Sequence, residues 1–174
     1  HTVLYRSLDN PNEKLVELLL AARTARSLGA RHLTLVAPYL AYMRQDIAFT
    51  PGEAVSQRHI AGLLGRTFDG VVTVDPHLHR IASLDEVMPG CRSMALSAAP
   101  LLGAWVARHV PGALLLSPDE EALQWVAAAG RAHGMDHAVC RKQRLGDREV
   151  RVALPALPLA GRAVVLMDDV ASTG

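Results

Sequence analysis

Short apolar runs alternate along the chain with longer stretches in which apolar residues recur at helical spacing. The first run, Thr2–Tyr5, is followed by Asn10 and Pro11, which predict a turn and the cap of a helix. Leucines and alanines then recur every three or four residues up to Gly29, a residue type that often ends a helix. The next apolar run, Leu33–Ala37, predicts a buried strand.

The same alternation of strands and helices continues to the end of the sequence. Because strands that alternate with helices are typical of βαβ units, we predict an α/β protein with mainly parallel sheets. The remaining predicted helices cover 54–64, 100–109 and 120–133, and the remaining predicted strands cover 71–74, Arg92–Leu96, 113–116, 137–141, 149–154 and 163–167.

A strand, an acidic loop and a helix recur in both halves of the chain. This repetition predicts two related α/β domains, 1–96 and 97–174. The sequence opens on His1 directly before an apolar strand and stops at Gly174 inside a turn-like run. We therefore expect a chain that is cut at both ends, with both domains partial.

The composition narrows the class of protein. Of the 174 residues, 50% are hydrophobic and 4% are aromatic, so the core must rest on Leu, Val and Ala. The 18 basic and 17 acidic residues nearly balance, which argues against nucleic acid as a partner. Cys91 and Cys140 match no zinc or redox spacing, and no apolar run approaches the length of a membrane span. We expect a cytoplasmic protein without a membrane partner.

Two acidic residues follow the last predicted strand. Asp168 and Asp169 come directly after the apolar run 163–167, and the small residues 171–174 follow them. Ligands of open α/β sheets bind at the carboxyl ends of strands, where backbone N–H groups can bind a phosphate. Carboxylates there accept hydrogen bonds from ribose hydroxyls or approach Mg²⁺. The alternative is an ordinary strand end with an Asp helix cap.

An acid and two imidazoles follow the predicted strand 71–74. Asp75 and His77 are placed to bind a metal directly or through its waters, and His79 is a nearby alternative. A solvated loop histidine is the competing interpretation.

A polar triplet follows the strand Leu33–Ala37. Arg44 offers a planar donor fork for phosphate oxygens, and Gln45 can pair with a base edge or a phosphate. The alternative is a surface arginine with Asp46 as its ion-pair partner.

A basic stretch runs from 141 to 148. Lys142 and Arg144, in a connection that contains Gly146, are able to close over a phosphoryl group during its transfer. A solvated hairpin is the alternative. Farther upstream, Asp119 follows a Leu-rich strand and opens a predicted helix, where it serves either as a cap or as a substrate contact.

Taken together and in this order, these segments resemble the ribose-phosphate pyrophosphokinase family. The resemblance covers nearly the whole chain, and several motifs at compatible spacing make chance agreement improbable. The matching segments are 9–11, 14–15, 38–46, 49–53, 75–77, 117–119, 142–144 and 168–174.

The resemblance implies two phosphoribosyltransferase-like α/β domains, with ATP near their junction and ribose 5-phosphate on the second domain. It also implies Mg²⁺ and a mobile catalytic pair. By resemblance, Arg44, Gln45, Asp46 and His77 belong to the ATP site, His77 and Asp119 to the metal site, Asp119, Asp168, Asp169, Ala171, Ser172, Thr173 and Gly174 to the ribose 5-phosphate site, and Lys142 and Arg144 to the catalytic pair.

Three departures from the family pattern qualify this transfer of roles. Many relatives have two glycines where this chain has Glu120 and Glu121, which argues against a tight approach of phosphate there. Many relatives also have an acid where this chain has Ser172, although a small hydroxyl residue is compatible with phosphate binding. The amino-terminal segment that the family uses in ATP binding is missing from this sequence.

The implied reaction transfers pyrophosphate from ATP to the C1 hydroxyl of ribose 5-phosphate and releases AMP. The family precedent also implies a homo-oligomer, either a dimer or a hexamer. Two alternatives stay open: a type I phosphoribosyltransferase, which shares the Asp168 and Asp169 loop, and a non-catalytic regulatory homologue of the synthetase. The first would have a single complete domain and no use for the polar triplet at 44–46.

Overall fold

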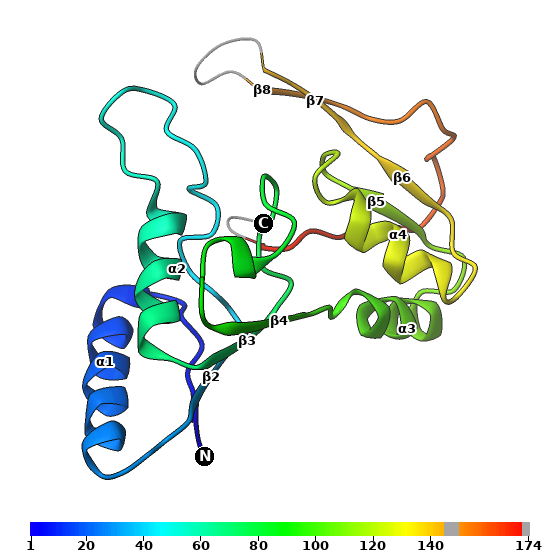
Figure 1. Ribbon diagram of the computed structural model, residues 1–174. Helices are drawn as coiled ribbons and strands as arrows, with labels where there is room; N and C mark the ends of the chain where they lie inside the picture. The colour runs from blue at the N-terminus through cyan, green and yellow to red at the C-terminus, as the bar shows by residue number, and fades with distance from the viewer. Residues whose placement is uncertain (145–149, 172–174) are drawn as a thin grey trace. The chain divides into compact units, whose positions relative to one another are not determined.

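The structure is a computed structural model that describes residues 1–144 and 150–171 of the chain. The chain folds into two compact units, His1–Leu96 and Ser97–Gly174. Each unit contains a parallel sheet with helices against it, which confirms the predicted α/β class with mainly parallel sheets (Figure 1). In the described part of the chain, no helix is both long enough and apolar enough to cross a membrane.

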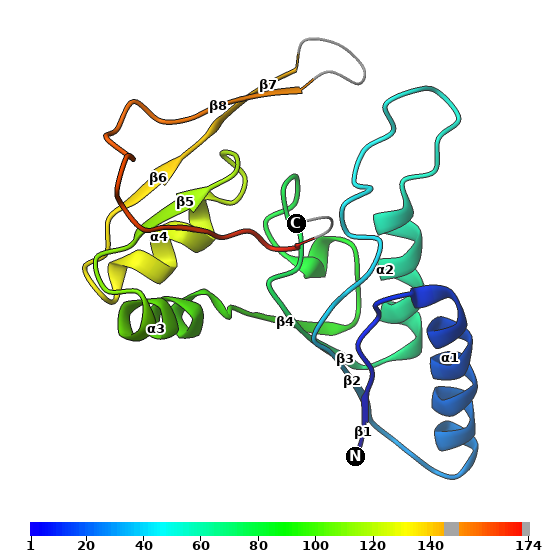
Figure 2. The same ribbon diagram turned by 180° about the vertical axis from the view of Figure 1, so that it is seen from behind.

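The first unit is built on a four-stranded sheet in the order β1-β2-β3-β4, and every neighbouring pair is parallel. The helices α1 and α2 lie on one side of this sheet in both ribbon views (Figures 1 and 2). Its elements are β1 (Thr2–Tyr5), α1 (Pro11–Ser27), β2 (Leu33–Ala37), α2 (Ser56–Thr67), β3 (Gly70–Val74), the short 3₁₀ helix η1 (Leu84–Glu86) and β4 (Arg92–Leu96).

The core of the first unit lies between the sheet and its two helices. In β2, Leu33, Leu35 and Ala37 are buried, whereas the residues between them are only half-buried, as expected for a strand with one face on a core. In α1, Leu18 and Ala22 stand four residues apart and are buried against the same cluster. The buried residues of the strand and of the helix therefore pack together in one apolar layer.

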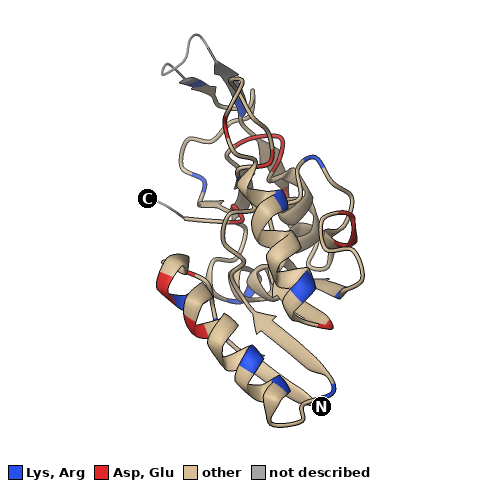
Figure 3. Cartoon of the chain, turned by 60° about the vertical axis from the view of Figure 1, so that its left-hand side comes forward, with Lys and Arg blue, Asp and Glu red and all other residues tan. Residues whose placement is uncertain are grey.

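The ends of α1 follow from local backbone chemistry. Asn10 occupies the N-cap position in the left-handed conformation (φ 48°), whereas a side-chain cap uses extended backbone, and its side chain makes no cap hydrogen bond. The position of the cap is as predicted, but the capping contact is not formed. Gly29 has φ 94°, which an L side chain rarely adopts, and this conformation ends the helix. Glu13 lies in the first turn and Arg26 in the last, so both charges complement the helix dipole (Figure 3).

The second unit contains a three-stranded parallel sheet in the order β6-β5-β9 and an antiparallel pair, β7-β8. The pair extends away from the sheet as an arm in both ribbon views (Figures 1 and 2). Its elements are α3 (Ala99–His109), β5 (Leu114–Ser117), α4 (Leu123–Arg131), β6 (His137–Val139), β7 (Arg141–Arg144), β8 (Val150–Ala153) and β9 (Val164–Leu166).

The central strand of this sheet is β5, and all four of its residues are buried. The helices α3 and α4 approach each other very closely at Gly103. A Cβ atom built there would lie 2.9 Å from the carbonyl carbon of Ala129 and closer still to its oxygen. Only glycine leaves room for this contact between two helix backbones.

Several predicted elements differ in their bounds from those observed; the helix predicted at 54–64, for example, lies at Ser56–Thr67. The helix predicted at 120–133 is shorter at both ends: α4 runs from Leu123 to Arg131, and the turn before it has the backbone N–H groups of Glu121 and Ala122 bonded to the side chain of Asp119. The connection predicted around Lys142 and Arg144 is instead the strand β7, which pairs with β8. The earlier hairpin alternative describes the backbone of this segment better.

Candidate functional site

The first unit gathers polar residues at the carboxyl ends of β2 and β3. These strands are adjacent and parallel, with Leu35 opposite Val71, so the segments that follow them leave the same edge of the sheet. The triplet 44–46 follows β2, and His77 follows β3. The fold therefore brings together the edge positions that the sequence analysis assigned to ATP.

The carboxylate of Asp46 forms an ion pair at this edge of the sheet. Nη1 of Arg80 donates to both Oδ1 and Oδ2 of Asp46, at 3.0 Å each. The side chain of Asp46 is 4% exposed, whereas that of Arg80 is 45% exposed. The alternative in the sequence analysis paired Asp46 with Arg44, whereas the ion pair found here joins Asp46 to Arg80.

A second anchor of the same loop is Gln57, in the first turn of α2. Its side chain is buried, with 1% of the residue exposed, and Nε2 donates to the carbonyl of Met43 at 3.1 Å. Its backbone N–H donates to the carbonyl of Gln45, also at 3.1 Å. Sequence analysis missed Gln57, although a glutamine at helical spacing from the buried Ala61 and Leu64 is a detectable signal.

The loop after β3 contains the histidines considered for metal binding. Asp75 has φ 40°, and its N–H donates to the carbonyl of Leu96 at 2.8 Å, so this loop turns sharply beside β4. The rings of His77 and His79 are 6.2 Å apart between centroids. Among the side chains that the structure describes, no group of three or more His, Cys, Asp or Glu is arranged to hold a metal.

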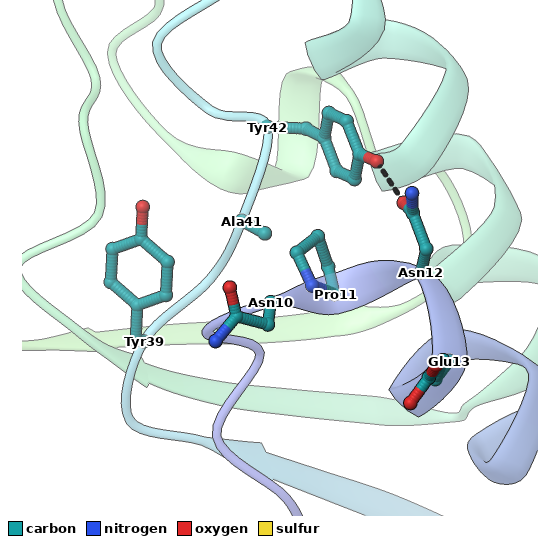
Figure 4. Close-up of a pocket in the computed structure, with 7 residues that line it drawn as sticks. All are labelled: Asn10, Pro11, Asn12, Glu13, Tyr39, Ala41 and Tyr42. Carbon is teal, nitrogen blue, oxygen red and sulfur yellow. Dashed lines mark hydrogen bonds between the residues drawn. The ribbon is translucent and has the colours of Figure 1, made fainter.

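A hollow of about 560 Å³ lies at the carboxyl ends of β1 and β2 (Figure 4). The start of α1 forms one wall and the loop after β2 the other. The hydroxyl of Tyr42 donates to Oδ1 of Asn12 across the hollow (Figure 4). Tyr42 has φ 67°, so the loop turns sharply just before Arg44. The lining consists of Asn10, Pro11, Asn12, Glu13, Tyr39, Ala41 and Tyr42.

The second unit gathers acidic residues at the carboxyl ends of β5 and β9. These strands are neighbours in the sheet, with Leu116 opposite Leu166, and Asp119 and Asp168 follow them. Oδ1 of Asp119 accepts hydrogen bonds from the N–H groups of Glu121 at 3.1 Å and Ala122 at 3.2 Å. These contacts close the turn that precedes α4, whose own N-cap position is Ala122, so Asp119 stabilises the approach to the helix and does not cap its first residue.

The carboxylate of Asp168 lies in an environment that disfavours its charge. Partial desolvation of the carboxylate is the largest cause of its raised pKa, even though the residue as a whole is exposed, and the negative charges of Asp169 and Asp119 add to the effect. The N–H of Asp169 donates to Oδ1 of Asp168 at 2.9 Å and opposes the shift. The structure therefore brings together the three acids that the sequence analysis placed beside the ribose.

The remaining predicted residues lie in the β7-β8 arm and at the end of the chain. Lys142 is opposite Val152 and Arg144 is opposite Val150 in the β7-β8 ladder. Ala171 is exposed. The predicted phosphate-loop residues Ser172, Thr173 and Gly174, and Gly146 of the basic stretch, lie outside the described residues.

The sequence of the chain is similar to known proteins along nearly its whole length. The model of the N-terminal domain of ribose phosphate pyrophosphokinase matches residues 2–67. The chain is 34% identical to ribose-phosphate pyrophosphokinase of Methanopyrus kandleri, over 99% of this chain and 59% of that protein. It is 31% identical to the Thermococcus kodakarensis protein of the same name, over 99% of this chain and 60% of the relative.

A solved structure shares the fold. The crystal structure of phosphoribosylpyrophosphate synthetase from Mycobacterium smegmatis superposes with a TM-score of 0.76 at 22% identity, over 95% of this chain and 53% of that one. The chain thus spans somewhat more than half the length of the curated relatives. The similarity in sequence to proteins named ribose-phosphate pyrophosphokinase runs through both units of the chain.

Proposed function

We propose that the protein is a ribose-phosphate pyrophosphokinase, which transfers pyrophosphate from ATP to ribose 5-phosphate. The observation that carries this proposal is the similarity to enzymes of that name over 99% of the chain, through both α/β units. The fold supports it, because each unit has polar residues at the carboxyl edge of its parallel sheet, where ligands of such sheets bind.

A phosphoribosyltransferase is the first rival function. It predicts a single complete domain and no use for a polar triplet after β2. The chain has two α/β units, and the loop bearing that triplet is anchored by the buried Gln57 and by Arg80. Both observations favour the synthetase.

In the proposed reaction the two units have separate tasks. The first unit binds the nucleotide through Arg44, Gln45 and His77. The second unit binds the sugar through Asp168 and Asp169, whose carboxylates accept hydrogen bonds from ribose hydroxyls. The C1 hydroxyl oxygen attacks the β-phosphorus of ATP, the bond from that phosphorus to the α-phosphate oxygen breaks, and AMP leaves while the hydroxyl proton is lost to solvent.

Catalysis would then rest on positioning and charge neutralisation. Lys142 and Arg144 would supply positive charge beside the transferring group. Magnesium would enter as Mg·ATP, because this metal commonly takes one or two carboxylates from the protein and its other ligands from phosphates and water. Of the two residues assigned to the metal, Asp119 suits magnesium better than His77 does, because magnesium prefers oxygen ligands. A homo-oligomer, dimeric or hexameric, belongs to the same proposal.

The test uses the full-length protein with Mg·ATP and ribose 5-phosphate. We expect AMP to be released in step with phosphoribosyl pyrophosphate, and AMP release to require both substrates. Chromatographic separation of the nucleotides distinguishes AMP from ADP. Release of ADP, or turnover only when phosphoribosyl pyrophosphate and a base are supplied, would reject pyrophosphoryl transfer.

A further inference from the structure

Two loops of the first unit carry all its residues that are assigned to the nucleotide. One loop follows β2 and contains the triplet 44–46, and the other follows β3 and contains His77. Loops that share a ligand must keep a fixed spacing, because a displacement of about 1 Å in a bound group can cost a large part of its effect. Whatever joins the two loops therefore bears on nucleotide binding.

The ion pair between Arg80 and Asp46 joins them. Arg80 lies three positions after His77, in the loop after β3, and its guanidinium holds both carboxylate oxygens of Asp46 at 3.0 Å. The carboxylate is almost completely buried, with 4% of the side chain exposed. An acid so placed needs a partner, because an unpaired charge away from water is strongly disfavoured.

We propose that Arg80 is a positioning residue of the nucleotide site, and that Asp46 acts through Arg80 rather than by touching the nucleotide. The pair holds the loop that carries Arg44 against the loop that carries His77, so that both side chains can meet one triphosphate. This inference rests on the proposed function, since that function assigns Arg44 and His77 to ATP.

The rest of the loop has its own anchor. Gln57 bonds the carbonyl groups of Met43 and Gln45 from α2, independently of Arg80. Loss of Arg80 should consequently leave the fold and the start of the loop in place, and change mainly how the two loops are aligned. Removal of the charge from Asp46 should have the same consequence, because each residue acts only through the other.

The experiment is a double-mutant cycle in the full-length protein. Arg80→Gln, Asp46→Asn and the double variant are compared with the wild-type protein by calorimetric titration with Mg·ATP, and KM for ribose 5-phosphate is measured separately. We expect each single variant to weaken ATP binding about tenfold, and the double variant to be no weaker than either single. KM for ribose 5-phosphate should stay within about twofold of the wild-type value. Arg80→Lys, which keeps the charge, should recover part of the affinity.

The control is Arg23→Gln, an exposed arginine on α1, which should leave ATP affinity unchanged. ATP affinity of Arg80→Gln equal to that of the wild-type protein would overturn the positioning role. So would additive losses in the double variant, or equal losses for both substrates, which would indicate general loosening of the fold. Failure of the proposed function would be recognised by a different result. The wild-type protein would then release no AMP, whatever ATP affinities the double-mutant cycle gives. If the wild-type protein binds no Mg·ATP, both proposals are overturned.

Discussion

The carboxylate of Asp69 accepts a hydrogen bond of 2.6 Å from the backbone N–H of Leu33, the first residue of β2. A second hydrogen bond joins the same two residues, since the backbone N–H of Asp69 donates to the carbonyl of Leu33 at 2.9 Å. Arg26, in the last turn of α1, donates to the same carboxylate at 2.6 Å. One acid thus ties the end of α1 to the starts of β2 and β3, the strands whose far ends carry the nucleotide loops.

Acidification should remove the stabilisation that Asp69 provides. The hydrogen bond from Leu33, followed by the interactions with Arg26, holds the pKa of Asp69 below its ordinary value. Because the pKa of Asp69 is lower in the folded state than in the unfolded state, the stabilisation is complete at pH values above the unfolded-state pKa. It is lost as the pH falls through the folded-state pKa, that is, below about pH 4. Asp69→Asn should cost about 1–2 kcal/mol at pH 7, a modest value because a third of the side chain is exposed.

Urea unfolding of the wild-type protein and Asp69→Asn at several pH values measures this difference. The two free energies of unfolding should converge as the pH falls below about 4. The control is Asp136→Asn, which removes an exposed ion pair with Arg162 and should cost less than about 0.5 kcal/mol. A difference between wild type and Asp69→Asn that is independent of pH would contradict the assigned cause.

Replacement of glycines in two helices should have opposite effects. Gly103→Ala places a methyl group against the carbonyl of Ala129, a backbone atom that cannot move without separating α3 from α4. We expect a loss of about 1–3 kcal/mol in the free energy of unfolding. Gly62→Ala in α2 meets only the flexible end of Arg66, at 3.3 Å, so the gain in helix propensity, up to about 1 kcal/mol, should be retained. Thermal unfolding followed by circular dichroism measures both, and stabilisation by Gly103→Ala would refute the close packing.

Neutralising Asp119 should lower the pKa of Asp168. Desolvation should keep that pKa above its ordinary value, but the repulsion from the neighbouring charge disappears. Asn can still accept the hydrogen bonds that Asp119 receives from Glu121 and Ala122, so the turn before α4 should persist. Carbon-detected NMR titration of the Asp168 carboxyl in Asp119→Asn measures the shift. Glu120→Gln removes the same charge one residue away and should change the pKa less; an equal effect would indicate a diffuse field instead of a specific neighbour.

Turnover should depend on Lys142 and Arg144, two of the three cations in β7. Lys142→Ala or Arg144→Ala in the full-length protein should lower kcat roughly 10²–10³-fold with little change in substrate affinity, because the proposed contact forms only during transfer. Steady-state kinetics with folding checked by circular dichroism decides the matter. Arg141→Ala, in the same strand, should retain turnover near the wild-type value. If all three variants behave alike, the arm has a structural role only.

The periodicity of the sequence was sufficient to predict the α/β class and most of its elements. The strands β1, β2 and β4 begin and end at the predicted residues, because a run of apolar residues between turn-forming residues has few other stable conformations. Residues that follow a strand could likewise be assigned to the ligand edge of a sheet, since that edge is set by chain direction alone. The roles of individual residues came from resemblance to a family.

The tertiary structure decided which distant residues meet. Arg80 and Asp46 are 34 residues apart, and nothing local to either predicts that the loops after β2 and β3 place them at 3.0 Å. Periodicity likewise did not predict the start of α4, which begins at Leu123 after a turn in which Asp119 accepts hydrogen bonds from the N–H groups of Glu121 and Ala122. Hydrophobic periodicity depends only on spacing along the chain, whereas ion pairs and buried polar contacts depend on the packing of elements that are far apart in sequence.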